Sequence, residues 1–119
     1  MTHPPIPGQN HFLETLHRTV EEHLDDPAFN VTRLVQLAGM SRTDLHRKLT
    51  RRTGLSASAF VRYVRVQRAK RLLAQYPDWC ICRVGYEVGF GSPSYFTRAF
   101  TALEGVGPGA YRERCLGGM

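Results

Sequence analysis

Basic side chains gather in one stretch of the 119-residue chain. The stretch holds ten of them: Arg42, Arg47, Lys48, Arg51, Arg52, Arg62, Arg65, Arg68, Lys70 and Arg71. With Asp44 as the one acidic residue among them, these ten side chains leave a formal balance of +9, against +6 for the whole chain. Guanidinium and ammonium groups bind phosphates and carboxylates, so the stretch predicts a polyanionic partner. Charge asymmetry alone is equally consistent with a solvated helical face.

Apolar residues interrupt this basic stretch at helical spacing, which excludes a disordered basic tail. The same spacing of three and four residues recurs along the chain, and strand signals are weak. We therefore predict an all-α fold of about seven helices. Their expected ranges are 11–24, 32–38, 42–52, 56–75, 79–88, 93–103 and 110–114.

Polar residues that accept a backbone hydrogen bond stand before these helices. The predicted caps are Asn10, Asn30 or Thr32, Ser41, Ser56 or Ser58, and Ser92. Apolar spacing turns one face of each helix inward. It places Leu34, Leu37 and Ala38 inside on the second helix, and Tyr95, Phe96, Ala99 and Phe100 inside on the sixth.

One pattern occurs twice: a short helix, a glycine, a capping serine and a second helix. Gly39-Met40-Ser41 in the first copy corresponds to residues 89–92 in the second. Each copy predicts a helix-turn-helix, a motif whose second helix enters the DNA major groove. The helix at 56–75 spans about 29 Å. It would hold the two second helices about one DNA turn apart, roughly 34 Å.

The pattern divides the chain into a first helix-turn-helix unit at 11–54, the linker helix, and a second unit at 79–114. Residues 1–10 are rich in proline, so we expect a flexible leader or a truncated linker. Residues 115–119 are expected to form a flexible tail. Apolar runs fall short of the roughly 18 residues that a membrane span needs, so no membrane partner is expected.

Several motifs of the second half resemble the DNA-binding domain of AraC/XylS-type transcription regulators. They are residues 54–73, Gly-Tyr-Glu-Val-Gly-Phe at 85–90, Ser-Tyr-Phe at 94–96 with Arg98 and Phe100, Gly-Val-Gly-Pro at 105–108, and Tyr111-Arg112. The resemblance covers roughly residues 11–114. Residues 39–49, with Leu55 and Phe60, are most similar to the C-terminal output domains of hybrid two-component sensors, which follow a phosphoreceiver domain.

The resemblance implies sequence-specific binding of double-stranded DNA by a cytoplasmic, nucleoid-associated regulator. The recognition helices would be 42–52 and 93–103. RNA polymerase becomes a candidate partner, and we expect an upstream receiver or effector-binding domain to be missing from this chain. The alternative is a helical protein–protein interaction adaptor with a basic face.

The resemblance also assigns contacts to individual residues. Base contacts would come from Thr43, His46, Arg47, Pro93, Ser94 and Arg98. Phosphate contacts would come from Ser41, Arg42, Lys48, Arg51, Arg62, Ser92 and Thr97. A guanidinium can grip guanine bidentately, which favours Arg47 and Arg98. Against this, Arg47 has Asp44 as an alternative partner, Arg98 has Glu104 or Asp78, and His46 can be an ordinary exposed histidine.

Five residues depart from the family pattern: Val35, Ala38, Gly85, Leu103 and Glu104. Glycine in a helix costs roughly 1 kcal/mol relative to alanine. Gly85 and the Leu103-Glu104 pair both lie in the second unit, so the hypothesis that follows is that this unit is the less stable half and binds DNA less tightly.

Catalysis and metal binding find little support in the sequence. Nothing places a nucleophile beside a base at readable spacing, so we expect no enzyme. Cys80, Cys82 and Cys115 lack zinc-site spacing, so neither a metal nor another cofactor is expected. Cys80 is predicted to be a half-buried filler and Cys82 a surface thiol.

Overall fold

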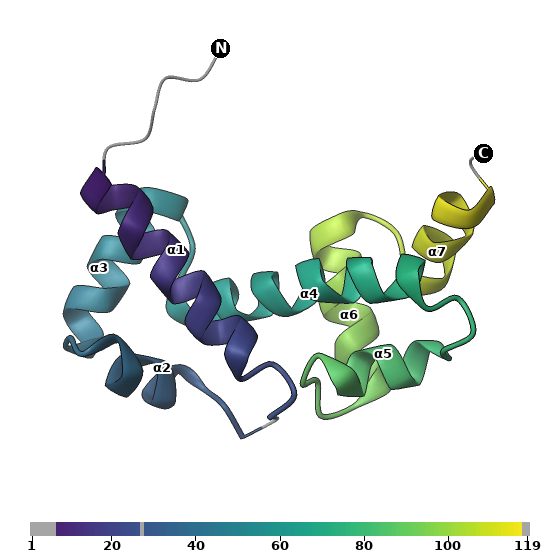
Figure 1. Cartoon of the computed structure of the whole chain (residues 1–119), viewed down its shortest axis with the longest axis horizontal. Helices are drawn as coiled ribbons and strands as arrows, with labels where there is room; N and C mark the ends of the chain where they lie inside the picture. The colour runs from purple at the N-terminus through teal and green to yellow at the C-terminus, as the bar shows by residue number, and fades with distance from the viewer. Residues whose placement is uncertain (1–6, 27, 118–119) are drawn as a thin grey trace, which may run out of the picture.

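Helices joined by short turns make up nearly all of the computed structural model, which describes residues 7–26 and 28–117 (Figure 1). Their bounds are α1 Pro7–Glu22, α2 Val31–Ala38, α3 Arg42–Thr53, α4 Ala57–Gln75, α5 Ile81–Glu87, α6 Pro93–Glu104 and α7 Pro108–Gly117. Within these described ranges there is no strand. The predicted all-α fold with seven helices is confirmed.

Helix α4 runs through the middle of the molecule, with α1–α3 around one end and α5–α7 around the other (Figure 1). Each end has its own apolar core. The first core includes Leu34, Leu45 and Leu49 and ends on α4 at Val64. The second begins on α4 at Val66 and includes Val84, Phe96 and Phe100. We call α1–α3 with the start of α4 the first unit, and α5–α7 with the rest of α4 the second unit.

The turn of each helix-turn-helix has the predicted construction. In the first unit Gly39 adopts φ +70°, a left-handed conformation that ends α2, and its N–H bonds back to that helix. The Ser41 side chain then accepts a hydrogen bond from the Asp44 N–H, which starts α3. In the second unit Ser92 accepts from the Tyr95 N–H and starts α6. The repeated pattern is therefore confirmed in three dimensions.

The helix ends differ from the prediction in several places. Helix α1 begins at Pro7, because proline is tolerated in a first turn, so Asn10 lies inside the helix and is not its cap. The first six residues of the predicted leader lie outside the described part. Asn30 and Ser56 are the caps that the structure selects. Helix α7 extends from Pro108 to Gly117, so the predicted tail is helical at its start.

Two apolar side chains predicted to be buried lie at the surface. Leu37 is 41% exposed and Tyr95 is 40% exposed. Both stand at the edge of an apolar stripe, where helical spacing alone does not decide between inside and outside. Tyr95 still packs by its edge on Phe90, with ring centroids 5.3 Å apart.

The departures from the family pattern in the second unit have local partners. A Cβ at Gly85 would lie 2.8 Å from Cδ2 of Phe96, so the glycine lets that ring pack directly on the α5 backbone. The Glu104 carboxylate lies 3.1 Å from the Lys70 ammonium on α4, while Leu103 remains exposed. These contacts remove part of the physical basis for expecting a less stable second unit.

Candidate nucleic-acid interface

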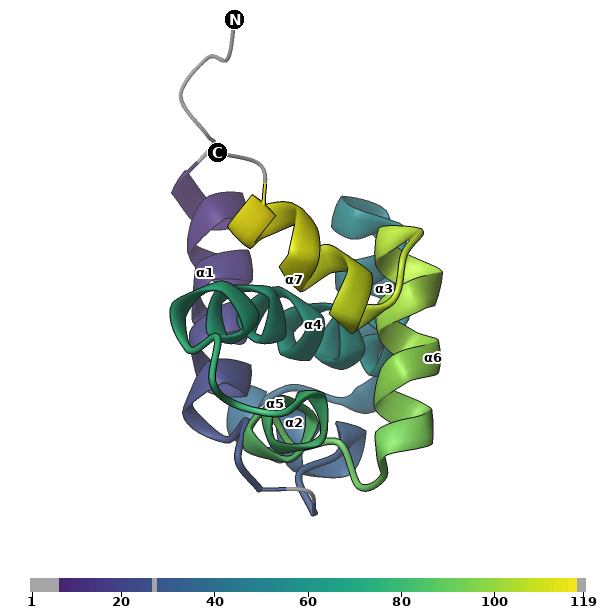
Figure 2. The same cartoon turned by 90° about the vertical axis from the view of Figure 1, so that its right-hand side faces the viewer.

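Helices α3 and α6 lie on the same side of the molecule (Figure 2). Viewed along the long axis, both stand opposite α1, with α4 between the two sides. Each is the second helix of its helix-turn-helix and begins at a serine cap. The two helices that the sequence assigned to recognition are therefore presented in one direction.

Buried leucines fix the rotation of α3. Leu45 and Leu49 are fully buried in the first core, which turns Thr43, His46 and Arg47 to the surface. The Arg47 Nη1 lies 3.5 Å from an Asp44 carboxylate oxygen, with both side chains more than half exposed. An exposed pair of this kind contributes little, so the guanidinium is available to another partner.

Aromatic residues fix α6 in the same way. Phe96 and Phe100 are fully buried, and Pro93, Ser94 and Arg98 are exposed. Glu104, one of the two alternative partners named for Arg98, instead forms an ion pair with Lys70. Among the described residues, Arg98 forms no ion pair.

Counting from the capping serine, α3 and α6 present matching exposed positions. The pairs are Thr43 and Ser94, His46 and Thr97, Arg47 and Arg98, and Thr50 and Thr101. They fall within an arc of about 100° on each helix. The last pair was missed by the sequence reasoning, although a spacing of four residues from His46 and Thr97 points to it.

The predicted phosphate contacts differ in their surroundings. Arg42 donates to the Thr32 hydroxyl at 2.7 Å, which holds its guanidinium across the start of α2. Arg51 is exposed. The Lys48 ammonium lies 4.7 Å from the centroid of the Phe12 ring on α1, a cation–π contact on the other flank of α3.

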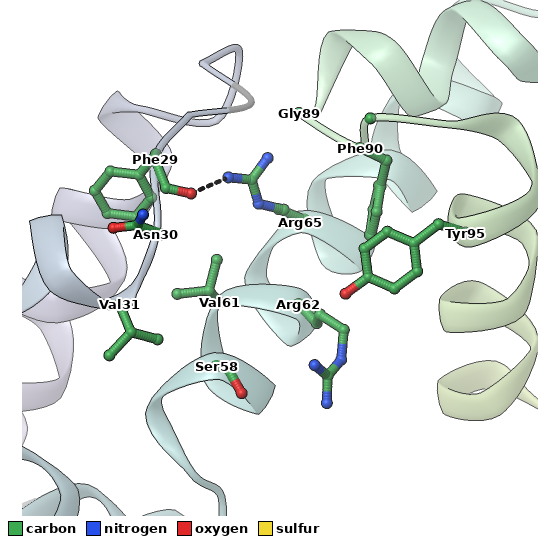
Figure 3. Close-up of a pocket in the computed structure, with 11 residues that line it drawn as sticks. Phe29, Asn30, Val31, Ser58, Val61, Arg62, Arg65, Gly89, Phe90 and Tyr95 are labelled. Atoms are coloured by element: carbon green, nitrogen blue, oxygen red, sulfur yellow. Dashed lines mark hydrogen bonds between the residues drawn. The ribbon is translucent and has the colours of Figure 1, made fainter.

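Arg62 lies in a pocket of about 250 Å³ between the two units (Figure 3). Asn30 and Val31 line it from the first unit, Ser58 and Arg62 from α4, and Tyr95 from α6. In the close-up the Tyr95 side chain points toward Arg62. This junction pocket therefore brings polar groups of α4 beside Tyr95 of α6 and beside Asn30, the cap of α2.

The basic stretch does not form one continuous face. Lys70 is paired with Glu104, and Arg71 lies 4.0 Å from Glu21 on α1. Arg68, Lys70 and Arg71 line a groove together with Glu21 of α1 and Tyr111 of α7. The expectation that the whole basic stretch meets one polyanionic partner is therefore wrong for this part of α4, because basic residues at different positions around a helix point to different sides.

Arg65 lies inside the molecule, although it belongs to the basic stretch that was expected at the surface. It is only 5% exposed, and its guanidinium donates to four backbone carbonyls from both units. Burial lowers the pKa of Arg65, and the nearby Tyr95 and Asp26 oppose that shift. Its charge therefore cannot be counted toward a nucleic-acid-binding surface.

The cysteines are free and exposed. Cys80 caps α5, where its sulfur accepts from the Arg83 N–H at 3.4 Å, so its predicted role as a half-buried filler is wrong. In the described ranges, no three His, Cys, Asp or Glu side chains lie together as metal ligands. None of the helices described is both long enough and apolar enough to cross a membrane.

A family model described as a helix-turn-helix domain matches residues 34–114, which include both helix-turn-helix turns, α4 and α6. The chain belongs to the AraC-type helix-turn-helix family. This AraC-type domain is 36% identical over 100 residues to the HTH-type transcriptional regulator MtrA of Neisseria gonorrhoeae. That match covers 82% of the chain and 33% of MtrA.

Two further similarities concern other settings of the AraC-type domain. Over 102 residues it is 31% identical to histidine kinase P4 of Formosa agariphila. The aligned region covers 86% of the chain and 7% of histidine kinase P4. The solved DNA-binding domain of AdpA, in complex with a target DNA, shares 31% identity at a TM-score of 0.75. That comparison covers 88% of the chain and 94% of the solved domain. The chain thus spans about a third of the length of MtrA and less than a tenth of the length of histidine kinase P4.

Proposed function

We propose that this AraC-type domain binds double-stranded DNA sequence-specifically, with α3 and α6 in two successive major-groove segments. The observation that carries the proposal is the matched presentation of the two helices on one side of the molecule. A recognition helix contacts base edges through its N-terminal residues, which here follow the capping serines. The DNA complex of the 31% identical AdpA domain supports this reading.

Base readout in this proposal falls to the outward positions of both helices. In α3 these are Thr43, His46 and Arg47, and in α6 they are Ser94 and Arg98, with Pro93 making an apolar contact. Each arginine would hold guanine O6 and N7 with two N–H groups. The matching of positions adds the outward threonines Thr50 and Thr101.

Phosphate contacts hold the domain in register without reading sequence. The first turns of α3 and α6 offer backbone N–H groups, together with the Ser41 and Ser92 hydroxyls. The proposed side-chain contacts are Arg42, Lys48, Arg51, Arg62 and Thr97. Arg62 lies in the junction pocket between the two units, beside Tyr95 of α6, which suits the backbone segment that joins the two grooves. Lys48 would have to leave Phe12 to take part.

For the whole protein we propose an output domain that follows a receiver or effector-binding domain. The support is length, since the chain spans 33% of MtrA and 7% of histidine kinase P4. A cytoplasmic, nucleoid-bound location and a contact with RNA polymerase belong to the same proposal.

The salt dependence of DNA binding tests the proposal against the adaptor alternative. A domain that neutralises about six phosphates loses roughly a thousandfold in affinity between 50 and 200 mM salt, through counterion release. We expect this loss with duplex DNA in a fluorescence anisotropy titration. Absence of duplex binding at 50 mM salt, with retention of an acidic protein instead, would favour the adaptor.

A further inference from the structure

The two units of this domain touch each other mainly through α4. Their apolar cores are separate, and they end at Val64 and Val66, on either side of Arg65. Among the described residues, each pair of helices with extensive contact either lies within one unit or has α4 as one of its two members. Something other than a shared core must therefore set the angle and distance between the two units.

The Arg65 guanidinium binds backbone from both units at once. Its Nη1 donates to Leu24 O at 3.2 Å in the first unit and to Val88 O at 2.8 Å in the second. Its Nη2 donates to Asp26 O at 3.5 Å and Phe29 O at 3.4 Å, the latter drawn in Figure 3. These carbonyls belong to the segments that lead into α2 and out of α5. One side chain thus ties the α1–α2 connection of the first unit to the end of α5 in the second unit.

Gly89, at the end of α5 in the second unit, packs against the Arg65 guanidinium and the Leu24 carbonyl. Its φ of +93° is a backbone conformation that other residues rarely adopt. A Cβ at this position would collide with the Arg65 guanidinium and with the Leu24 carbonyl oxygen. The end of α5 therefore rests directly against backbone of the first unit, with the guanidinium beside it.

The chemistry of this contact requires arginine. A guanidinium presents five N–H donors in a rigid planar fork, whereas a lysine ammonium is a single point on a flexible stem. Fixed donors that reach carbonyls in two directions resist both rotation and separation of the units. A buried guanidinium is costly unless it is hydrogen-bonded, and here the protein supplies the acceptors.

We propose that Arg65, seated against Gly89, is a positioning residue that sets the spacing between the two recognition helices. It thereby sets the spacing of the two DNA blocks that the domain accepts. This inference rests on the proposed two-helix readout. It makes Arg65 important for binding without any contact between Arg65 and DNA.

The test uses a two-block duplex selected by the wild-type chain, with the spacer between the blocks altered by one or two base pairs. Single-block duplexes, with the other block scrambled, are measured beside it. Arg65→Met removes the fork and keeps an apolar stem. Arg68→Met is the matched control, because it removes one positive charge from an exposed position of the same helix. Circular dichroism establishes that each variant is folded.

Wild type is expected to bind best at one spacing and to lose affinity steeply on either side. Arg65→Met should lose about tenfold at that spacing, comparable to one hydrogen bond to a charged group. Arg65→Met should lose much less affinity at the altered spacings. Its affinity for single-block duplexes should stay within about twofold of wild type, because the contacts of each helix with its own block are unchanged. Arg68→Met should keep the wild-type profile.

Two results with folded Arg65→Met overturn the inference. One is an unchanged spacing profile. The other is an equal loss on single-block and two-block duplexes, which would assign Arg65 to general stability. If Arg65→Met does not fold, Arg65→Lys and Gly89→Ala are judged by the same criteria, and failure of all three to fold also contradicts the inference. A wild-type chain that selects only one block contradicts the proposed function itself, which separates the two failures.

Discussion

The two helix-turn-helix units share a backbone plan and differ in charge and in core chemistry. Helix α3 carries five basic side chains and one acidic one, whereas α6 carries one of each. The second core contains a chain of aromatic contacts, with centroid distances of 5.2 Å from Phe90 to Phe96, 5.8 Å from Phe96 to Phe100, and 5.5 Å from Phe100 to Tyr111. In the proposed function this difference separates two tasks: the first unit would supply more of the attraction to phosphate, and the aromatic core of the second unit would support its recognition helix.

The largest expected effect concerns the independence of the two cores. Phe96→Ala should destabilise the second unit by about 3–5 kcal/mol, the usual cost of deleting a buried phenylalanine. Hydrogen exchange should show lost protection in α5 and α6, with α1 largely unchanged. Leu45→Ala is the mirror control and should affect the first unit alone. A common loss across all helices in both variants would show that the two cores behave as one.

A substitution at Gly85 sets the gain in helix propensity against the loss of close packing with Phe96. Alanine gains about 1 kcal/mol of helix propensity at an unconstrained position. Here its methyl would lie 2.8 Å from Phe96, so we expect Gly85→Ala to lower the free energy of unfolding by about 1–3 kcal/mol through overpacking. Urea denaturation measures the change. A stabilised variant would mean that Phe96 shifts freely and that the second core is loosely packed.

Arg47 and Arg98 occupy matching positions on α3 and α6, so substituting each one tests base readout in its own unit. Arg47→Ala and Arg98→Ala should each cost about 1–3 kcal/mol of binding free energy and relax sequence preference at one position. The relaxed position should lie in a different block for each variant. Quantitative binding to a panel of single-base substitutions identifies the block. Relaxation in the same block, or uniform loss in both variants, would contradict the assigned roles.

The smallest expected effect separates two basic residues on the flanks of α3. Arg51→Ala should weaken all sequences alike and reduce the slope of log affinity against log salt by about 0.9, as expected for one phosphate contact. Lys48→Ala should change the slope less, because its ammonium lies over Phe12. Titrations at several salt concentrations measure both slopes. A larger change for Lys48 would mean that it leaves Phe12 when DNA binds.

Sequence reasoning recovered the features that local chemistry determines. The serine caps, the left-handed Gly39 and the outward face of α3 follow from hydrogen-bonding capacity, backbone freedom and apolar spacing within a few residues. The repeated pattern in the two halves was visible for the same reason. The exposure of Thr43, His46 and Arg47 needed no knowledge of distant segments.

The features that were missed depend on segments far apart in the sequence. Arg65 was counted as surface charge, because nothing near it in sequence reveals that Leu24 and Val88 offer it carbonyls. Arg112 is similar, since it donates to Leu73 O, Tyr76 O and Trp79 O around the end of α4. Helix propensity alone marks Gly85 as a weakness of α5, since the Phe96 ring that packs against it belongs to another helix. Spacing gives a direction around one helix, and only the fold shows what lies there.

Selection of bound duplexes from a random library, followed by sequencing, tests the central claim most directly. The claim is that two recognition helices on one side of the domain read two successive major-groove segments. It predicts two short enriched blocks with centres about ten base pairs apart, the distance of one DNA turn. A single enriched block would contradict it by showing that one helix reads bases alone, and no enrichment would exclude sequence-specific binding.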